Sequence, residues 1–326
     1  MRVLPKPLAG ATLVVLAYIA IGGVVAAAVA PFKPRGEFID IGGRKLRIVC
    51  MGPKTNAPTI LFEPGAFGMA ADFGAVQEKV TAQGFHSCSY DRAGMGWSDP
   101  GPQPRDGNAV VSDLEKLLAA AHEDGPFILV GHSMAGLYLR LYAGRNPEKV
   151  AGLVLVDAAT PEASDVPRVQ AFVKAFTKAS KLASFGASAG LYWPLMGTRL
   201  GDKIGLPADA AAEKRRAFAS AGHNRTAAAE VAQWPATSQQ ARAIGPYNPD
   251  WPVAVVTAGP SRVKALAGWK SLQAAPARLS HHGFYENVPE ASHTTLLGEH
   301  YGEAVLRGID HVRDAIAAAH APAAKG

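Results

Sequence analysis

The chain has 326 residues, of which 48% are hydrophobic and 18% charged, so it can bury one large core or two smaller ones. This composition excludes a disordered chain, and the 34 glycines and 24 prolines follow no fixed period, which excludes collagen-like and solenoid repeats. The formal net charge is +6, and its basic excess lies in residues 1–36 and 160–250. Aromatic and basic residues are not interleaved there, so we predict no nucleic-acid partner.

Residues 8–30 form an uncharged and mostly apolar run. As a helix this run would be about 34 Å long, enough to cross a bilayer core of about 30 Å. A cleaved signal peptide is the alternative, because Ala28-Val29-Ala30 has the small residues of a cleavage site, but the run is longer than the usual apolar region of such peptides. We therefore predict that residues 1–35 anchor the protein in a membrane. The short N-terminal tail favours an extracytoplasmic location, periplasmic or at the cell surface, for the rest of the chain.

From residue 36 onward, short apolar runs alternate with helical stretches. Two β-rich runs joined at Gly42-Gly43 predict a hairpin over residues 36–50. Further strands are predicted over residues 58–65, 85–92, 126–131, 151–157, 251–259 and 283–289, and helices over 70–83, 106–122, 134–146, about 261–275 and 299–319. This alternation predicts an α/β fold with a mostly parallel eight-stranded sheet and helices on both faces.

Residues 160–248 interrupt the alternation, with helical segments and no convincing strand. A helical region between two sheet strands predicts a cap or lid on a core of residues 36–159 and 249–320. The segment 168–182 carries its lysines on one face and its valines and phenylalanines on the other. This pattern favours a lid helix packed over the core, with contact to lipid headgroups as the alternative. The aromatic residues of the region favour an apolar substrate.

The stretch Gly131-His132-Ser133-Met134-Ala135-Gly136 leads from a predicted strand directly into a predicted helix. So sharp a turn needs small residues on both sides of the serine, and Ala135 meets this need with less room than glycine. The turn would hold Ser133 above the carboxyl edge of the sheet, where parallel α/β sheets bind ligands and a helix N-terminus stabilises negative charge. We therefore predict that Ser133 is a nucleophile.

On this strand order, this turn and a late histidine, the chain from about residue 36 to 319 resembles the α/β hydrolase fold family. The segment DRAGMGWSDP, residues 91–100, also resembles a turn that many of these enzymes carry after the fourth strand. The resemblance implies catalysis through an acyl-enzyme without a metal or an organic cofactor. It also implies that the second and fourth strands are neighbours, which would bring Cys50 and Cys88 together as a disulfide or as buried thiols.

A serine hydroxyl needs a base, and the base needs a carboxylate that sets its tautomer. The family's chain order of serine, acid and histidine implies His293, in the loop between the last strand and the last helix. The acid commonly follows the seventh strand, but residues 251–285 contain no Asp or Glu. The alternative position in the family is the end of the sixth strand, which implies Asp157. An N-cap is the other role open to Asp157. Weaker candidates for the acid are Glu162, Asp250 and Glu286.

The oxyanion of an acyl-transfer reaction needs backbone N–H donors. The resemblance implies that Met134, the residue after the nucleophile, supplies one of them. The second should come from the loop after the third strand, where Glu63-Pro64-Gly65 replaces the His-Gly pair that the family often shows. This donor role is carried over to Ala66.

The sequence thus predicts a carboxylesterase-like serine hydrolase that acts on an ester of a small or medium, apolar substrate. An aminopeptidase or a cofactor-free peroxidase-like enzyme is the alternative among enzymes, and a noncatalytic binding protein of the same fold is the alternative outside them. Epoxide hydrolase and dehalogenase chemistry is disfavoured, because those relatives use an aspartate where Ser133 stands.

Overall fold

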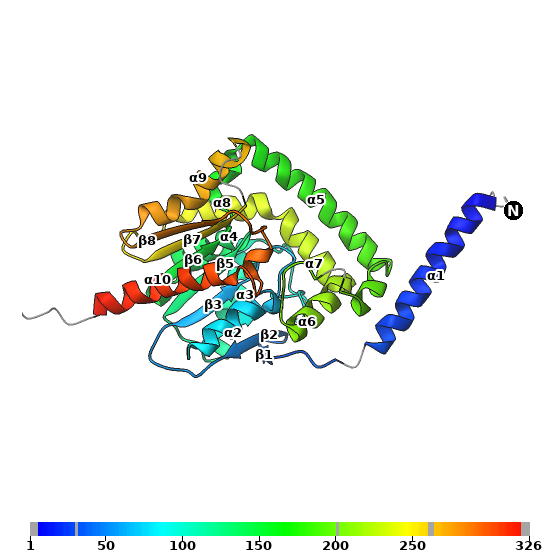
Figure 1. The fold of residues 1–326 in the computed structure, drawn as a ribbon, viewed down its shortest axis with the longest axis horizontal. Coiled ribbons are helices and arrows are strands. Elements are labelled where there is room, and N and C mark those ends of the chain that lie inside the picture. Colours follow the sequence, from blue (N-terminus) through cyan, green and yellow to red (C-terminus); the bar gives the residue numbers. More distant parts are fainter. Residues whose placement is uncertain (1–5, 30–31, 200–201, 260–263, 321–326) are drawn as a thin grey trace, which may run out of the picture.

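An eight-stranded sheet forms the centre of the molecule, and its order is β1-β2-β4-β3-β5-β6-β7-β8 (Figure 1). The computed structural model describes residues 6–29, 32–199, 202–259 and 264–320. The strands are β1 (Glu37–Asp40), β2 (Lys45–Met51), β3 (Thr59–Glu63), β4 (Ser87–Tyr90), β5 (Phe127–His132), β6 (Val150–Val156), β7 (Val253–Ala258) and β8 (Gly283–Val288). β2 is antiparallel to β1 and β4, and all other neighbours are parallel. The predicted mostly parallel eight-stranded sheet is confirmed.

Helices cover both faces of the sheet. The helical elements of the core are η1 (Ala70–Phe73), α2 (Gly74–Ala82), α3 (Gly107–Ala120), α4 (Ala135–Arg145), η2 (Pro147–Lys149), α9 (Lys264–Leu279), η5 (Thr295–Leu297) and α10 (Gly302–His320). In β5, Ile128 and Val130 pack with residues of α2 and α10, whereas Leu129 packs with residues of α3 and α4. Because both faces are buried, the central strands are continuous apolar runs rather than alternating ones.

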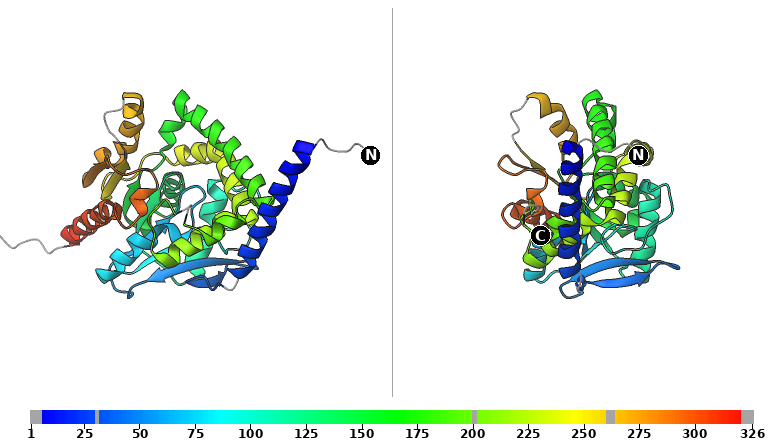
Figure 2. Two further views of the ribbon diagram at one scale, coloured as in Figure 1. Left: turned by 45° about the vertical axis from the view of Figure 1, so that its right-hand side comes forward. Right: turned by 90° about the vertical axis from the view of Figure 1, so that its right-hand side faces the viewer.

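The described residues between β6 and β7 form helices and loops, and we call residues 160–248 the insertion. Its helices are η3 (Pro161–Asp165), α5 (Pro167–Ser188), η4 (Trp193–Gly197), α6 (Ala208–Ala219), α7 (Ala221–Ala232) and α8 (Trp234–Ile244). α5 and α7 lie side by side, and Figure 2 shows them standing off the sheet. α8 packs against α3 and α4. The insertion therefore rests on the core through α8 and extends over it through α5 and α7.

The predicted transmembrane anchor is wrong. Among the residues that the structure describes, no helix combines the length and the apolar character needed to cross a bilayer. The predicted membrane-anchored, extracytoplasmic location rests on this anchor and is therefore also wrong. The apolar run does form a helix, α1 (Lys6–Ala28), and part of it contacts the insertion: the Tyr18 hydroxyl donates to the carbonyl of Leu191 at 3.1 Å, and Gly22 lies against the ring of Pro194. An apolar sequence pattern predicts a helix, but it does not say what that helix packs against.

The buried guanidinium of Arg92 joins the insertion to the sheet. It donates to both carboxylate oxygens of Glu230 in α7 at 2.8–3.1 Å and to Glu63, at the end of β3, at 2.9 Å. It also donates to the carbonyls of Pro64 and Gly65 at 2.5 and 2.8 Å. Buried charges are stable only when they are paired and hydrogen-bonded. One side chain therefore ties together β3, the loop after it and α7.

We expect Arg92→Met to lower the free energy of unfolding by about 3–5 kcal/mol, because it leaves two carboxyl groups buried without their cation. Urea denaturation followed by circular dichroism measures this loss. Arg145→Met is the matched control, since Arg145 pairs with Glu115 at 2.8 Å in a partly exposed position. Its loss should stay within about 1 kcal/mol. Equal losses in the two variants would contradict an anchoring role for Arg92.

Candidate active site

Ser133 occupies the tight turn between β5 and α4. Its φ is +59°, in the left-handed region that residues other than glycine rarely adopt. The Ser133 N–H donates to the carbonyl of Val156 at 3.1 Å, and the Ser133 carbonyl accepts from the N–H of Ala159 at 2.8 Å. Such a conformation persists only where the surroundings hold it. Here β6 and the residues after it hold the turn from both sides.

The turn has room because its neighbours are small. A Cβ atom at Gly131 would lie 2.5 Å from Leu139 Cδ1, and one at Gly136 would lie 2.3 Å from the carbonyl oxygen of Ala159. Ala135 is fully buried, and its Cβ is 3.3 Å from the position that a Gly131 Cβ would take. Alanine is therefore tolerated at position 135 because positions 131 and 136 are glycine.

His293 lies in the loop between β8 and η5, and its Nδ1 is 2.6 Å from Oδ2 of Asp157. Asp157 follows the end of β6 and has φ +43°. Because a carboxylate only accepts hydrogen bonds, Nδ1 carries the hydrogen, and Nε2 of the neutral ring is left as a proton acceptor. The other carboxylate oxygen, Oδ1, accepts from Nε2 of Gln273 in α9 at 3.0 Å. The two partners fix the orientation of the carboxylate.

Two opposing effects act on the pKa of Asp157. Burial alone would raise it, but the hydrogen bond with His293 and the nearby imidazoles outweigh burial and hold the pKa below its ordinary value. The carboxylate is therefore ionised at neutral pH. An ionised carboxylate in this position can stabilise a positive charge on the imidazole.

His132 supports the loop that carries His293. Its Nε2 donates to the carbonyl of His293 at 2.8 Å, and the two ring centroids are 4.4 Å apart. Burial, together with the proximity of His293, lowers the pKa of His132 to about 3. His132 is therefore neutral at physiological pH, and it positions the loop without adding a charge to the site.

The loop after β3 lies directly on the turn of Ser133. A Cβ atom at Gly65 would be 2.8 Å from the Cβ of Ser133, so this close approach requires glycine. Within the described part of the chain, the N–H groups of Ala66 and Met134 donate no hydrogen bond. Ala66 also lines the same cavity as Ser133. Two unused amides thus stand close to the serine.

The direction of the Ala66 N–H follows from the contacts of the preceding carbonyl. In a trans peptide the carbonyl and the following N–H point in opposite directions. Because Arg92 binds the carbonyl of Gly65, the N–H of Ala66 points away from Arg92. On the other side of Ala66, Lys214 of α6 donates to the carbonyl of Phe67 at 2.7 Å. The core and the insertion therefore hold this loop together.

Ser133, Asp157 and His293 line one cavity of about 1410 Å³. Ligand sites commonly measure about 300–1000 Å³, so this cavity is large. The rings of Phe67, Phe172, Phe176 and Trp234 contact one another and form part of its wall. We call this group the aromatic wall. The aromatic wall thus gives the cavity an apolar surface.

The charged groups of the cavity include two ion pairs, and Arg168 and Lys203 also line it. Lys214 lies 2.7 Å from Asp72, and Arg215 lies 2.5 Å from Asp202. Pairing lets these charges lie in a partly buried position. A substrate would therefore meet neutralised pairs here.

The predicted site residues are brought together, with one contact left open. Ser133 and His293 line the same cavity, but no hydrogen bond joins them within the described residues. Such a contact is often long before substrate binds. The weaker candidates for the acid are engaged in other ion pairs: Glu162 with Arg140, Asp250 with His281, and Glu286 with Arg307. None of these three carboxylates lines the cavity.

Three supporting residues carry no signal in the sequence. Gln273 donates to Asp157. Lys214 and Arg92 both donate to carbonyls of the loop after β3. Arg92 lies in the DRAGMGWSDP segment, which the sequence identifies by resemblance as a turn but which says nothing about the contacts of this arginine. Gln273 and Lys214 lie on helices whose orientation decides their contacts. No local spacing could have identified them.

The comparisons with known proteins agree with this fold. The sequence model described as the alpha/beta hydrolase fold matches residues 58–299. An uncharacterized protein of Schizosaccharomyces pombe is 26% identical over 235 residues, which are 69% of this chain and 41% of that protein. The chain spans less than half of the length of the curated relatives that it matches.

Solved structures resemble the chain over most of its length. The enol-lactonase from Burkholderia xenovorans has a TM-score of 0.59 and 16% identity, covering 84% of this chain and 99% of its own. The Cif epoxide hydrolase from Acinetobacter nosocomialis has a TM-score of 0.65 and 15% identity, covering 88% of this chain and 94% of its own. At such low identity the likeness shows the fold alone.

The network around Arg92 also contains a carboxyl group with a shifted pKa. Burial raises the pKa of Glu63 from 4.5 to about 7, although Arg92 and the Tyr90 hydroxyl act in the opposite direction. Between these two pH values the folded protein retains a proton that the unfolded chain has released. The contribution of Glu63 to stability is therefore present below about pH 4.5 and is lost as the pH rises through about 7.

We expect the stability of the wild type relative to Glu63→Gln to fall by about 1–3 kcal/mol between pH 4.5 and 7.5, because glutamine does not titrate. Urea denaturation at several pH values gives this difference directly. Glu115→Gln, a substitution at the surface, controls for the loss of a carboxyl group outside the network. A difference between wild type and Glu63→Gln that stays constant with pH would contradict the raised pKa.

Proposed function

Because the chain belongs to the α/β hydrolase fold family, we propose that it is a carboxylesterase-like serine hydrolase that cleaves an ester through an acyl-enzyme. One observation carries the proposal. Ser133 is held at φ +59° beside two unused amides, and in the same cavity Nδ1 of His293 lies 2.6 Å from Asp157. Side chains suited to the roles of nucleophile, base and acid therefore stand on the elements that the proposed mechanism requires, which supports the proposal.

Acylation assigns one role to each residue. The Ser133 hydroxyl attacks the ester carbonyl while Nε2 of His293 takes its proton. Asp157 stabilises the resulting imidazolium, and the N–H groups of Ala66 and Met134 donate to the oxyanion of the tetrahedral intermediate. His293 then gives the proton to the leaving alkoxide, and the alcohol departs. No metal or organic cofactor takes part in this proposal.

Deacylation uses the same groups with water as the nucleophile. His293 removes a proton from the water, which attacks the acyl-enzyme, and the same oxyanion donors stabilise the second intermediate. Collapse of this intermediate returns the proton to Ser133 and releases the acid. The neutral ring of His132 supports both half-reactions, because it holds the loop of His293 without competing for the proton.

The cavity supports an apolar ester as the substrate. The aromatic wall would bury an acyl or aryl group, and burial of apolar surface stabilises binding by about 25 cal/mol per Å². An aminopeptidase would need a carboxylate to bind the amino group of its substrate. Among the described residues that line the cavity, Asp72 and Asp202 are already paired with cations, and Asp157 is bound to His293. These pairings leave no carboxylate of the described cavity lining for an amino group, which favours an ester substrate over that of an aminopeptidase.

We propose that the insertion acts as a lid. Phe172 and Phe176 of α5 and Trp234 of α8 belong to the aromatic wall, so the insertion contributes directly to the cavity. Lys214 of α6 contacts the loop that carries Ala66. A lid that builds one side of the cavity can select the substrate and exclude water from the reaction.

A fluorophosphonate probe tests for an activated serine. We expect the wild type to be labelled on Ser133, because the general base and the oxyanion donors promote attack on phosphorus as they do on an ester. Ser133→Ala should not be labelled. Ser271→Ala, which changes another serine of the same cavity, should be labelled like the wild type. A folded wild type that stays unlabelled would rule out the proposed mechanism.

We expect Asp157→Asn to lower kcat for p-nitrophenyl butyrate by about 10³–10⁴, because an amide no longer holds the imidazole in the required tautomer. Asp202→Asn is the matched control, since Asp202 lines the same cavity but pairs with Arg215. Its kcat should stay within about tenfold of the wild type. Circular dichroism of each variant checks the fold. Unchanged turnover in Asp157→Asn would show that another residue is the acid.

A further inference from the structure

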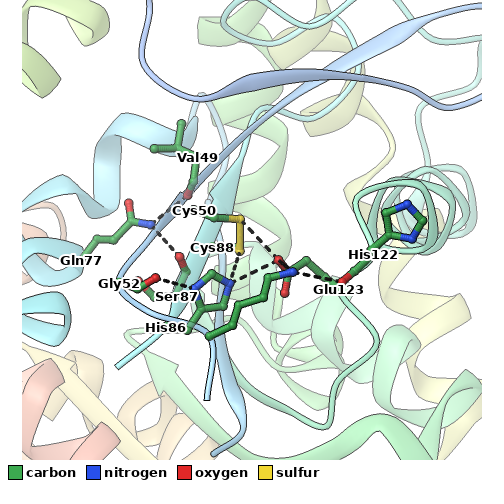
Figure 3. The surroundings of a disulfide bond; sticks show 10 residues. Val49, Cys50, Gly52, Gln77, His86, Ser87, Cys88, His122 and Glu123 are labelled. Carbon is green, nitrogen blue, oxygen red and sulfur yellow. Dashed lines mark hydrogen bonds and ion pairs between the residues drawn. A yellow bond between two sulfur atoms is a disulfide. The ribbon is translucent and has the colours of Figure 1, made fainter. Parts of the chain in front are cut away.

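Four side chains with metal-binding atoms gather at the amino ends of β4 and β5, on the sheet edge opposite to Ser133 (Figure 3). They are Cys50 of β2, His86 before β4, Cys88 of β4 and Glu123 before β5. We call this group the cysteine cluster. Cys50 and Cys88 face each other across the antiparallel strands and form a disulfide with an S–S distance of 2.05 Å. His86 and Glu123 are not needed to form the disulfide, so their position beside it needs an explanation.

Three distances within the cysteine cluster are close to those of a tetrahedral zinc site, and its four ligand atoms lie within 4.8 Å of one another. Zinc binds sulfur at about 2.3 Å and nitrogen or oxygen at about 2.0–2.2 Å, which places tetrahedral ligand atoms about 3.3–3.8 Å apart. Nε2 of His86 lies 3.6 Å from Sγ of Cys88 and 3.2 Å from Oε1 of Glu123. Sγ of Cys50 lies 4.0 Å from the same oxygen. Only the two sulfur atoms are too close for a zinc site, and the disulfide bond accounts for that.

The orientation of His86 is compatible with a role as metal ligand. Its Nδ1 lies 3.0 Å from the carbonyl oxygen of Gly52, and because a carbonyl only accepts, Nδ1 carries a hydrogen. A neutral ring would then direct the lone pair of Nε2 at the carboxylate of Glu123. That contact requires a cation between the two atoms, either a proton or a metal ion. Histidines that bind metals usually donate their other N–H to a carbonyl or a carboxylate in this way.

One further cation faces the cluster. Nζ of Lys54 lies 2.7 Å from Oε1 of Glu123 and 3.1 Å from the carbonyl of His122. The Lys54 side chain is 57% exposed, whereas those of Glu123 and His86 are 6% and 7% exposed. Because the Lys54 side chain is mostly exposed, a metal ion bound to Glu123 can displace the ammonium group into water.

We propose that reduction of the Cys50–Cys88 disulfide converts the cysteine cluster into a zinc site with Cys50, Cys88, His86 and Glu123 as ligands. A dithiol supplies two electrons and two protons, becomes a cyclic disulfide and leaves two protein thiols. Zinc then binds both sulfurs as thiolates, and two protons are released to water. The sulfur atoms need to separate to about 3.8 Å, which side-chain rotation on two neighbouring strands can provide.

Replacement of the disulfide by a bound zinc ion would keep β2 and β4 linked under both oxidising and reducing conditions. A disulfide links the strands under oxidising conditions, and a metal ion bound at the same four side chains links them under reducing conditions. The proposal does not depend on the reaction at Ser133, since the cluster lies at the other edge of the sheet.

Zinc content tests the proposal directly. The full chain is purified in the disulfide form, one half is reduced with dithiothreitol, and both halves receive zinc chloride and then pass through gel filtration. We expect one zinc ion per reduced chain and less than about one tenth of that in the disulfide form. Cobalt substitution of the reduced chain should give the visible bands of a tetrahedral site and a thiolate charge-transfer band. A folded reduced chain without zinc, or equal zinc in both forms, would overturn the proposal.

Two histidine variants separate this site from adventitious binding. His86→Asn should weaken zinc binding of the reduced chain at least about tenfold in competition with a chelator. His122→Asn is the matched control, because His122 is next to Glu123 and its ring points away from the cluster in Figure 3. Its affinity should stay within about twofold of the wild type. Equal affinities in the two variants would show that the zinc lies elsewhere. If reduction unfolds the chain and zinc does not restore its circular dichroism spectrum, the proposal also fails.

Discussion

The buried guanidinium of Arg92 is the interaction on which the geometry of the candidate site depends. It binds the carbonyls of Pro64 and Gly65, and the planarity of the peptide then directs the N–H of Ala66 away from it. The same group binds Glu63 at the end of β3 and Glu230 in the insertion. The loop beside Ser133 and helix α7 of the insertion therefore share one anchor.

The parallel sheet places different chemistry at its two edges. The carboxyl ends of β5 and β6 lead into Ser133 and Asp157, both at positive φ, where short turns expose side chains to the cavity. The amino ends of β4 and β5 carry His86 and Glu123 beside the disulfide. Strand direction explains this separation, because residues that follow parallel strands meet at one edge and residues that precede them meet at the other. The residues at one edge of the sheet therefore do not contact those at the other edge directly.

Much of the fold and part of the candidate site could be predicted from the sequence. The strands were recognisable because buried parallel strands are continuous apolar runs. The family resemblance implies Asp157, because residues 251–285 contain no acid and some members carry it at the end of the sixth strand. The structure places the Asp157 carboxylate 2.6 Å from His293, and the roles of both are proposals. The apolar N-terminal run predicted a transmembrane anchor wrongly, since hydrophobicity along the chain does not reveal the neighbours of a helix. The contact of Gln273 with Asp157 spans 116 positions and depends on the orientation of α9.

The sequence by itself determined the alternation of strands and helices and the tight turn at Gly131 to Gly136. These features are local, because sterics and periodicity act between residues close in the chain. Only the tertiary structure decided that Cys50 and Cys88 form a disulfide, that Arg92 directs the Ala66 amide and that the insertion completes the cavity wall. Each of these contacts joins segments distant in sequence. Their geometry follows from the packing of strands and helices, which no short stretch of sequence contains.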